Sequence, residues 1–79
     1  MNIPLRLSPR EIEVLRWLAQ GEGPKQIAHR LRITVRTCEH YVASARRKLG
    51  ARNSTHAVAI AMAAGMLASQ LVEGTFIDH

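Results

Sequence analysis

The stretch PKQIAHRLRITVRTCEHYVASARRKLG, residues 24–50, decides the fold of this 79-residue chain. It predicts a short helix over residues 24–31, because proline suits the first helical position and apolar residues then recur on one face. Thr34 is a favourable N-cap and begins a longer helix over residues 35–49, which Gly50 ends. The inward faces are Ile27, Ala28 and Leu31 in the first helix and Cys38, Val42, Ala45 and Leu49 in the second.

Outside this stretch the sequence predicts one helix before it and one after it. Ser8 is the N-cap of the earlier helix, with Glu11 three residues later in a capping box, and Gly21 ends it. The later helix begins within residues 53–55 and reaches at least Ala64. The earlier helix is expected to bury Ile12, Leu15, Leu18 and Ala19. Because no strand pattern is present, the chain is predicted to be an all-α, compact four-helix domain.

The length of the chain allows one domain. We expect an N-terminal extension or linker end over residues 1–6, the four-helix core over 7–67 and a tail over 68–79. A single cysteine excludes a disulfide framework and argues against a zinc site. The stretch 57–72, which has neither charge nor histidine, is only 16 residues long, which is short for a membrane span. No signal-peptide core is present at the start, so no membrane partner or export is expected.

Positive charge is concentrated in the part of the chain that carries the first three helices. Eleven lysines and arginines against six acids give a net charge of +5, and all eleven cations lie between Arg6 and Arg52. Through Asn53 the balance is +7, and from Ser54 onward it is −2. Such one-sided charge predicts a face that binds a polyanion, either nucleic acid or anionic lipid.

Two helices joined by a tight turn, the second of them longer and basic, form the helix-turn-helix arrangement. The major groove of DNA admits a helix, whose outer face near its N-terminus reaches the base edges. The expected base contacts are Arg36, Glu39, His40 and Ala43. The expected phosphate contacts are the first amides of the helix with the hydroxyls of Thr34 and Thr37, and the cations Lys25, Arg30, Arg46, Arg47 and Lys48.

Three features of this helix have a simpler interpretation beside the functional one. The cations Arg46, Arg47 and Lys48 also suit the negative end of the helix dipole. Glu39 also suits an ion pair with Arg36 or Arg46 along the helix. Cys38 is expected to be a small core residue rather than a redox sensor, and no metal site is expected.

A series of markers over residues 7–67 resembles the LuxR/GerE-type DNA-binding domain of bacterial transcription regulators. The markers are LSPREIEVL at 7–15, Gly21, KQIA at 25–28, Leu31, Ile33-Thr34, Thr37, KLGA at 48–51, Ala57-Val58, Ala61 and Gly65-Met66-Leu67. The segment ARRKLGARN at 45–53 most resembles the quorum-sensing branch. The resemblance implies that the third of four helices reads the major groove, with base contacts mapping onto Glu39, His40 and Ala43. It also implies a two-fold dimer through the fourth helix on inverted half-sites.

Several positions depart from the family pattern. Gly23-Pro24 stands where serine or threonine commonly caps the second helix, Cys38 replaces valine, Tyr41 replaces histidine, and Ser54 stands where arginine is frequent. Glu39 and Ala43 occupy base-reading positions that are often basic in relatives. These departures bear on which DNA sequence is read and not on the fold.

The fourth helix is apolar on every side, and such a helix favours burial on more than one face. With one face on the core, the residues left outward are Ala59, Met62, Ala63 and Met66, and these are expected to form a homodimer interface. The alternative is that the tail, residues 69–79, folds back over them.

We therefore expect a cytoplasmic, nucleoid-associated transcriptional regulator that binds double-stranded DNA as a homodimer on an inverted repeat. No cofactor is expected, and no enzymatic activity, since the sequence shows no nucleophile–base pair and no phosphate loop. RNA polymerase is a further candidate partner. One alternative is a promoter and polymerase binder resembling sigma-factor region 4, which the apolar fourth helix disfavours. The other is a protein-interaction module that pairs with a related full-length regulator and blocks it, with Glu39 and Ala43 weakening its own DNA binding.

Overall fold

The computed structural model describes residues 6–67 and contains four helices within them: α1 (Pro9–Ala19), α2 (Pro24–Leu31), α3 (Val35–Leu49) and α4 (Ser54–Ala63). No strand occurs among these residues, so the predicted all-α, four-helix domain is confirmed. The bounds of α2 and α3 are those predicted, whereas α4 ends at Ala63, one residue before the minimum length expected. The proposed tail over residues 68–79, including its folding back over α4, lies outside the described residues.

Each helix begins on a side-chain or backbone cap that the sequence encodes. Ser8 and Glu11 form both hydrogen bonds of the capping box at α1, as predicted. At α2 the cap is Gly23, which has no side chain, but its N–H donates to Gln26 Oε1 at 2.9 Å. Gln26 thus supplies half of a capping box, and this compensates for the departure from serine or threonine at that position. Thr34 caps α3 as predicted.

The turn between α2 and α3 contains an unusual backbone conformation. Arg32, the C-cap of α2, has φ 60° and ψ 44°, which is the left-handed region that favours glycine. It is the one non-glycine residue with positive φ in the described part of the chain. The next N–H, that of Ile33, donates to the carbonyl of Ala28 at 3.0 Å and closes the end of α2. The short helix-turn-helix connection therefore carries a small strain at a cationic residue.

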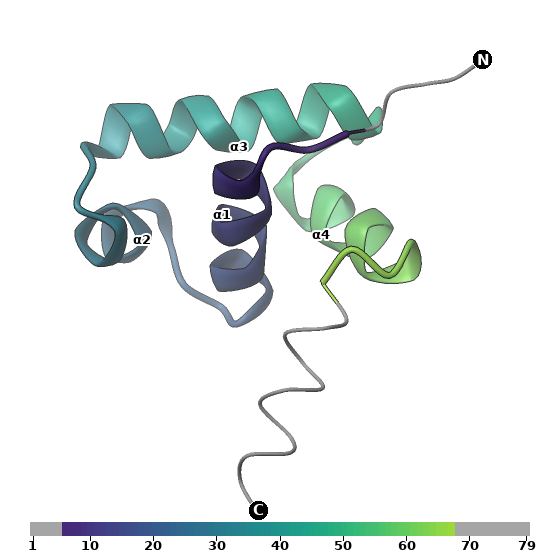
Figure 1. Ribbon diagram of the computed structural model, residues 1–79, viewed down its shortest axis with the longest axis horizontal. Helices are drawn as coiled ribbons and strands as arrows, with labels where there is room; N and C mark the ends of the chain where they lie inside the picture. The colour runs from purple at the N-terminus through teal and green to yellow at the C-terminus, as the bar shows by residue number, and fades with distance from the viewer. Residues whose placement is uncertain (1–5, 68–79) are drawn as a thin grey trace, which may run out of the picture.

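Helix α1 lies beneath the middle of α3, with α2 to one side of it and α4 to the other (Figure 1). It packs against all three of the other helices. One group of buried residues joins α1, α2 and the first half of α3: Val14, Ile27, Ala28 and Cys38. A second group joins α1, the second half of α3, α4 and the turn that follows it: Leu15, Ala45, Ala57, Ala61 and Leu67. Leu18 packs against both groups, so α1 holds the two halves of the core together.

Two details of the predicted apolar faces were wrong. Val14, which the predicted stripe of α1 omitted, is fully buried, and Ala19, which the stripe included, is exposed. Val14 is buried because α2 packs beside α1, so the buried face of α1 is wider than one stripe. After α4 the chain turns at Gly65, whose φ is 76°, and brings Leu67 back into the core. None of the helices described for residues 6–67 has the length and apolarity needed to cross a bilayer.

Candidate nucleic-acid interface

The N-terminus of α3 presents unpaired donors. Thr34 Oγ1 accepts a hydrogen bond from the N–H of Thr37 at 3.0 Å and donates one to Thr37 Oγ1 at 2.9 Å. The hydroxyl hydrogen of Thr34 is therefore used within the protein, whereas that of Thr37 is free to donate outward. The amides of Val35 and Arg36 have no acceptor within the helix, because they belong to its first turn. These groups form a small set of donors suited to an anion.

The outer face of α3 carries the predicted base-contacting residues. Arg36, Glu39 and His40 are exposed, and Ala43 is half-buried. A shallow hollow of about 320 Å³ runs along one side of this face and is lined by Leu18, Pro24, Glu39, Val42, Ala43, Arg46 and Ser54. The structure thus brings Glu39, Ala43 and Arg46 together on one surface.

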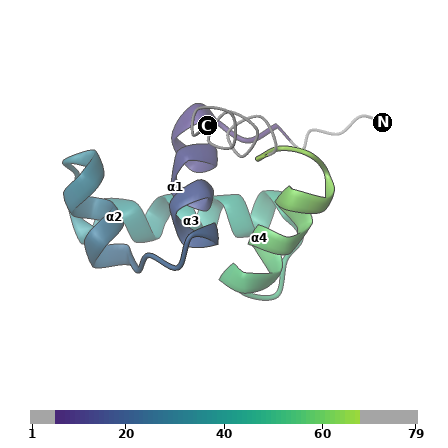
Figure 2. The ribbon, with the colours of Figure 1, turned by 90° about the horizontal axis from the view of Figure 1, so that it is seen from below.

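The first residues of two other helices, Pro24 of α2 and Ser54 of α4, line the same hollow. Both helices begin on the same side of the domain, along the lower edge of Figure 2. The positive ends of their dipoles therefore flank the side of α3 on which Glu39, Ala43 and Arg46 lie. Lys25 is exposed in the first turn of α2 and adds a cation there. This arrangement suits a nucleic-acid groove, because the phosphates of the strand that borders the groove would lie beside these positive groups.

Glu39 is unpaired among the described residues. Neither Arg36 nor Arg46 forms an ion pair with it, since the three ion pairs of residues 6–67 are Arg10–Glu13, Arg30–Glu22 and Lys48–Glu11. The alternative that Glu39 pairs with a neighbouring arginine along α3 is therefore wrong. Its carboxylate is available for an external donor.

The cations expected to bind phosphates form two groups, according to whether they make an ion pair within the protein. Lys25, Arg46 and Arg47 make no ion pair within residues 6–67. Arg30, by contrast, donates from Nε and Nη2 to the two carboxylate oxygens of Glu22, at 3.0 and 3.2 Å. Its guanidinium also lies 4.1 Å from the centre of the Trp17 ring, so its position is fixed by the protein. The hydrogen bond and the charge of Glu22 raise the pKa of Arg30.

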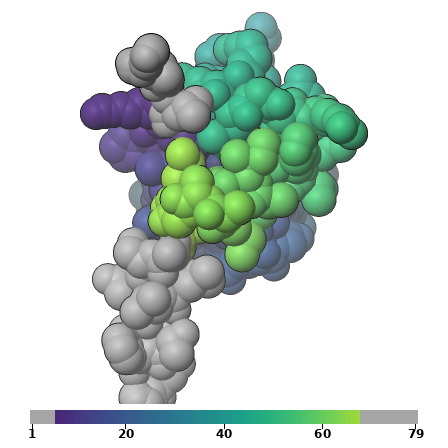
Figure 3. Space-filling model, turned by 90° about the vertical axis from the view of Figure 1, so that its right-hand side faces the viewer, coloured from purple at the N-terminus to yellow at the C-terminus, as the bar shows by residue number. Residues whose placement is uncertain are grey.

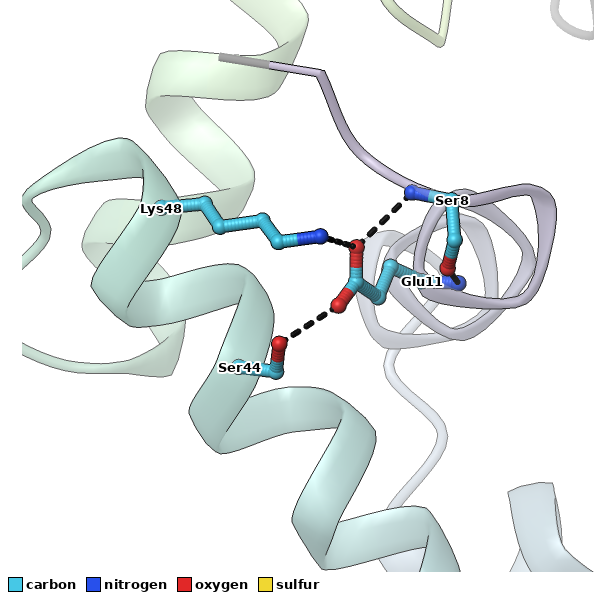
Figure 4. A network of polar contacts seen from close by, with 4 residues as sticks. All are labelled: Ser8, Glu11, Ser44 and Lys48. Atoms are coloured by element: carbon cyan, nitrogen blue, oxygen red, sulfur yellow. Dashed lines mark hydrogen bonds and ion pairs between the residues drawn. The ribbon is translucent and has the colours of Figure 1, made fainter. Parts of the chain in front are cut away.

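Lys48 was likewise expected at the phosphates, and its contacts in the structure are internal. Its Nζ donates to Glu11 Oε1 at 2.9 Å, and that oxygen also accepts from the Ser8 amide at 2.8 Å (Figure 4). Ser44 Oγ donates to the other oxygen, Oε2, at 2.6 Å. Glu11, only 4% exposed, thus ties the start of α1 to the second half of α3.

The Glu11 carboxylate is held in its charged form by this network. Burial by itself raises the pKa of Glu11, but the hydrogen bonds from Ser44 and Ser8 and the ion pair with Lys48 outweigh it and lower the pKa to about 2. The local sequence pattern predicts only that Glu11 is half of a capping box. The contact with Lys48 joins residues on different helices, and no local spacing rule reports such a pair.

Cys38 is fully buried between α1, α2 and α3, as predicted for a core residue. Burial, with a smaller contribution from the charge of Glu39, raises the pKa of its thiol, which keeps the thiol protonated and unreactive at neutral pH. Within residues 6–67 no group of three or more histidine, cysteine or acidic side chains is placed to hold a metal ion.

The outward surface of α4 forms much of one side of the molecule, beside the C-terminal end of α3 (Figure 3). Ala59, Met62 and Ala63 are exposed, and Met62 is 47% exposed although it is large and apolar. Met66 differs from its predicted position. It lies in the turn after α4, is half-buried and packs against the core, because the helix ends before it.

The family of the chain is identified by the sequence of most of its helical part. Residues 5–61 match the sequence model of the family described as GerE, bacterial regulatory proteins, luxR family. The chain belongs to the LuxR family of bacterial regulatory proteins. The resemblance found from the sequence markers is thereby confirmed.

Two curated relatives show how much of a LuxR-family protein the chain represents. Transcriptional activator protein BjaR1 of Bradyrhizobium diazoefficiens is 54% identical over 57 residues, which cover 72% of this chain and 24% of BjaR1. The HTH-type quorum sensing-dependent transcriptional regulator RpaR of Rhodopseudomonas palustris is 47% identical over 62 residues, 78% of this chain and 26% of RpaR. The chain thus spans about a quarter of the length of these relatives.

Two solved structures agree with the fold. A phage VqmA in complex with DPO has a TM-score of 0.73 at 37% identity, covering 82% of this chain and 30% of that one. VqmA of Vibrio cholerae in complex with a ligand and DNA has a TM-score of 0.69 at 35% identity, covering 78% and 27%. The described residues are therefore the helix-turn-helix DNA-binding domain of a LuxR-type transcriptional regulator.

Proposed function

We propose that this LuxR-family domain binds double-stranded DNA in a sequence-specific manner, with α3 in the major groove. The observation that carries the proposal is the outer face of α3, where Arg36, Glu39 and His40 are exposed and form no ion pair with any described residue. The same face is bordered by the N-termini of α2 and α4, which favour phosphate oxygens. The base-contacting residues would be Arg36, Glu39, His40 and Ala43.

Phosphate binding is assigned to groups around this face. The Val35 and Arg36 amides and the Thr37 hydroxyl would meet one phosphate strand, and Thr34 would orient Thr37 rather than bind directly. Lys25, Arg46 and Arg47 would supply the sequence-independent electrostatic attraction. Arg30 and Lys48 are left out of this set, because Glu22 and Glu11 already neutralise them.

We further propose that two copies pair through α4 and read an inverted repeat. Support comes from the exposed Ala59, Met62 and Ala63, since the two small alanines allow a second helix to approach closely. The similar VqmA of Vibrio cholerae is described as a dimer. Met66 would contribute only at the edge, since it packs against its own core.

The complete activity would be regulation of transcription at the nucleoid in the cytoplasm, without catalysis. BjaR1 is named a transcriptional activator and RpaR a quorum sensing-dependent transcriptional regulator. The single domain would extend over residues 1–79, with residues 7–67 as its core.

Selection of bound sites from random duplex DNA tests the proposal, with the 79-residue chain as bait. The expected product is a pair of inverted half-sites whose centres lie about one helical turn apart. Retention of single, unpaired half-sites would contradict the dimer, and enrichment of no sequence at all would overturn specific binding. A chain that retards no DNA and pairs only with a full-length LuxR-type regulator would instead establish an interaction module.

A further inference from the structure

Glu39 is the only acidic residue within α3 (VRTCEHYVASARRKL). It is exposed in the first half of the helix, on the face proposed to enter the groove, so any role for it at the bases rests on the proposed function. A carboxylate in that place is repelled by the phosphates on both sides of the groove. Unless it meets a donor there, it weakens binding.

The protein supplies no such donor from the described residues. Arg36 lies one turn before Glu39 and forms no ion pair with it, and Arg46 lies two turns after, about 10 Å along the helix axis. Ala43, one turn after Glu39 and lining the same hollow, has a methyl group that neither donates nor accepts. The described residues therefore leave the hydrogen-bonding capacity of the Glu39 carboxylate unused.

The major-groove edges of the bases differ in what they offer to a carboxylate. Guanine presents two acceptors, and thymine an acceptor and a methyl group. Adenine presents its N6 donor next to the N7 acceptor, which repels a carboxylate. Cytosine presents the N4 donor without an acceptor on the same base. Cytosine is thus the best partner for an acceptor-only side chain, and guanine is the worst.

We infer that Glu39 is a specificity-determining residue of this domain, selecting a cytosine whose N4 amine donates to its carboxylate in each half-site. The same charge opposes binding to sequences that lack the cytosine, because the repulsion from the phosphates is then not compensated. Glu39 therefore lowers the affinity for DNA that lacks the cytosine and does not lower the affinity for the operator. It raises the ratio of specific to non-specific binding rather than affinity itself.

The test compares the chain with Glu39→Gln, and with Glu13→Gln as a matched control. Glu13 is a half-buried acid on α1 that pairs with Arg10, so its removal changes net charge equally without touching α3. Each protein is used to select sites from random duplex DNA and is then titrated with the selected site and with a scrambled duplex. Far-UV circular dichroism checks that helix content is unchanged.

Glu39→Gln is expected to shift the selected base from cytosine to adenine, because an amide both donates and accepts. It is also expected to lose about 5- to 100-fold of the preference for the cytosine site and to bind scrambled DNA more tightly. Replacing the cytosine by N4-methylcytosine, which fills the donor position with a methyl group, should weaken the parent chain and leave Glu39→Ala unaffected. Glu13→Gln should select the parent sequence.

An unchanged selected sequence with Glu39→Gln would overturn the inference and leave the proposed function standing. An equal shift with Glu13→Gln would overturn it too, since net charge alone would then be responsible. If the parent chain selects no sequence, the proposed function fails, and the inference fails with it.

Discussion

Lys48 and Glu11, 37 positions apart in the sequence, are joined by a 2.9 Å ion pair whose carboxylate is buried and whose ammonium group is partly exposed. The pair fastens the first turn of α1 to the last turn of α3. A lysine within a run of three cations thus serves the fold of the protein, while the two arginines beside it are free of ion pairs within residues 6–67.

Removing the carboxylate is expected to lower stability and to change how stability depends on pH. The pKa of Glu11 is about 2 in the folded chain against 4.5 for an unperturbed carboxyl group. Because the unfolded chain takes up the proton first, the stabilisation is complete above about pH 4.5 and is lost as the pH falls towards 2. Glu11→Gln should reduce the free energy of unfolding at pH 7 by about 1–3 kcal/mol.

Urea unfolding followed by circular dichroism between pH 7 and pH 2.5 measures this effect. The parent chain should lose more stability than Glu11→Gln between pH 4.5 and pH 2.5. Glu13→Gln, which removes a partly exposed carboxylate on the same helix, should behave as the parent chain does. If the free energy of unfolding changes with pH by the same amount in the parent chain and in Glu11→Gln, the network does not hold Glu11 in its charged form.

The cations near the end of α3 are expected to separate into structural and DNA-binding residues. Lys48→Met should lower the free energy of unfolding by about 1 kcal/mol and leave the salt dependence of DNA binding unchanged. Arg46→Ala and Arg47→Ala should each reduce the slope of log K against log salt by about 0.9 for each phosphate that is no longer neutralised. Fluorescence anisotropy with a labelled duplex at several salt concentrations measures the slopes.

Arg10→Ala is the matched control for the salt series, since it removes a cation that Glu13 already neutralises on α1. Its slope should equal that of the parent chain. The assignment of Lys48 to the fold is refuted if the slope falls with Lys48→Met. The assignment of Arg46 and Arg47 to phosphates is refuted if the slope stays constant with Arg46→Ala and Arg47→Ala.

A charge on the exposed face of α4 is expected to prevent pairing of two copies. Met62 is 47% exposed, so Met62→Glu should keep the fold and reduce the sedimenting mass from dimer to monomer. Gln20→Glu introduces the same charge at an exposed position after α1 and should leave the mass unchanged. The α4 interface is disproved if the parent and Met62→Glu sediment alike at every concentration.

The strained turn between α2 and α3 gives a further prediction. Arg32 has a φ of 60°, which costs an ordinary residue about 1–2 kcal/mol, and glycine relieves this strain while adding freedom to the unfolded chain. Arg32→Gly should therefore raise the free energy of unfolding by up to about 1 kcal/mol. Gly50, which has a similar φ of 66°, provides the converse test, because Gly50→Ala should be destabilising. Thermal unfolding of both variants decides the matter.

Local signals in the sequence predicted most of the fold. The caps at Ser8 and Thr34 and the glycine after α3 set helix ends that the structure reproduces. The end of α4 was misplaced by one residue because its composition stays apolar beyond Ala63, although Gly65, with a φ of 76°, stands just after the C-cap as Gly50 stands at the end of α3.

The candidate site was predicted less completely, for a different physical reason. Exposure of Arg36, Glu39 and His40 follows from the periodicity of a single helix. Whether a cation is free depends on which acid the rest of the fold places beside it, and the partners of Arg30 and Lys48 come from outside their own helices. Charge counting alone therefore assigned both residues to the DNA face.

The position of α1 in both halves of the core bears on the spacing of the DNA site. Because α3 and α4 pack on α1 and on each other, no flexible segment separates the helix proposed to read the bases from the helix proposed to pair two copies. Two copies paired through α4 would hold their α3 helices at one separation and one rotation. An operator whose spacer is lengthened by about five base pairs turns its second half-site to the opposite side of the duplex, where the second copy cannot follow it.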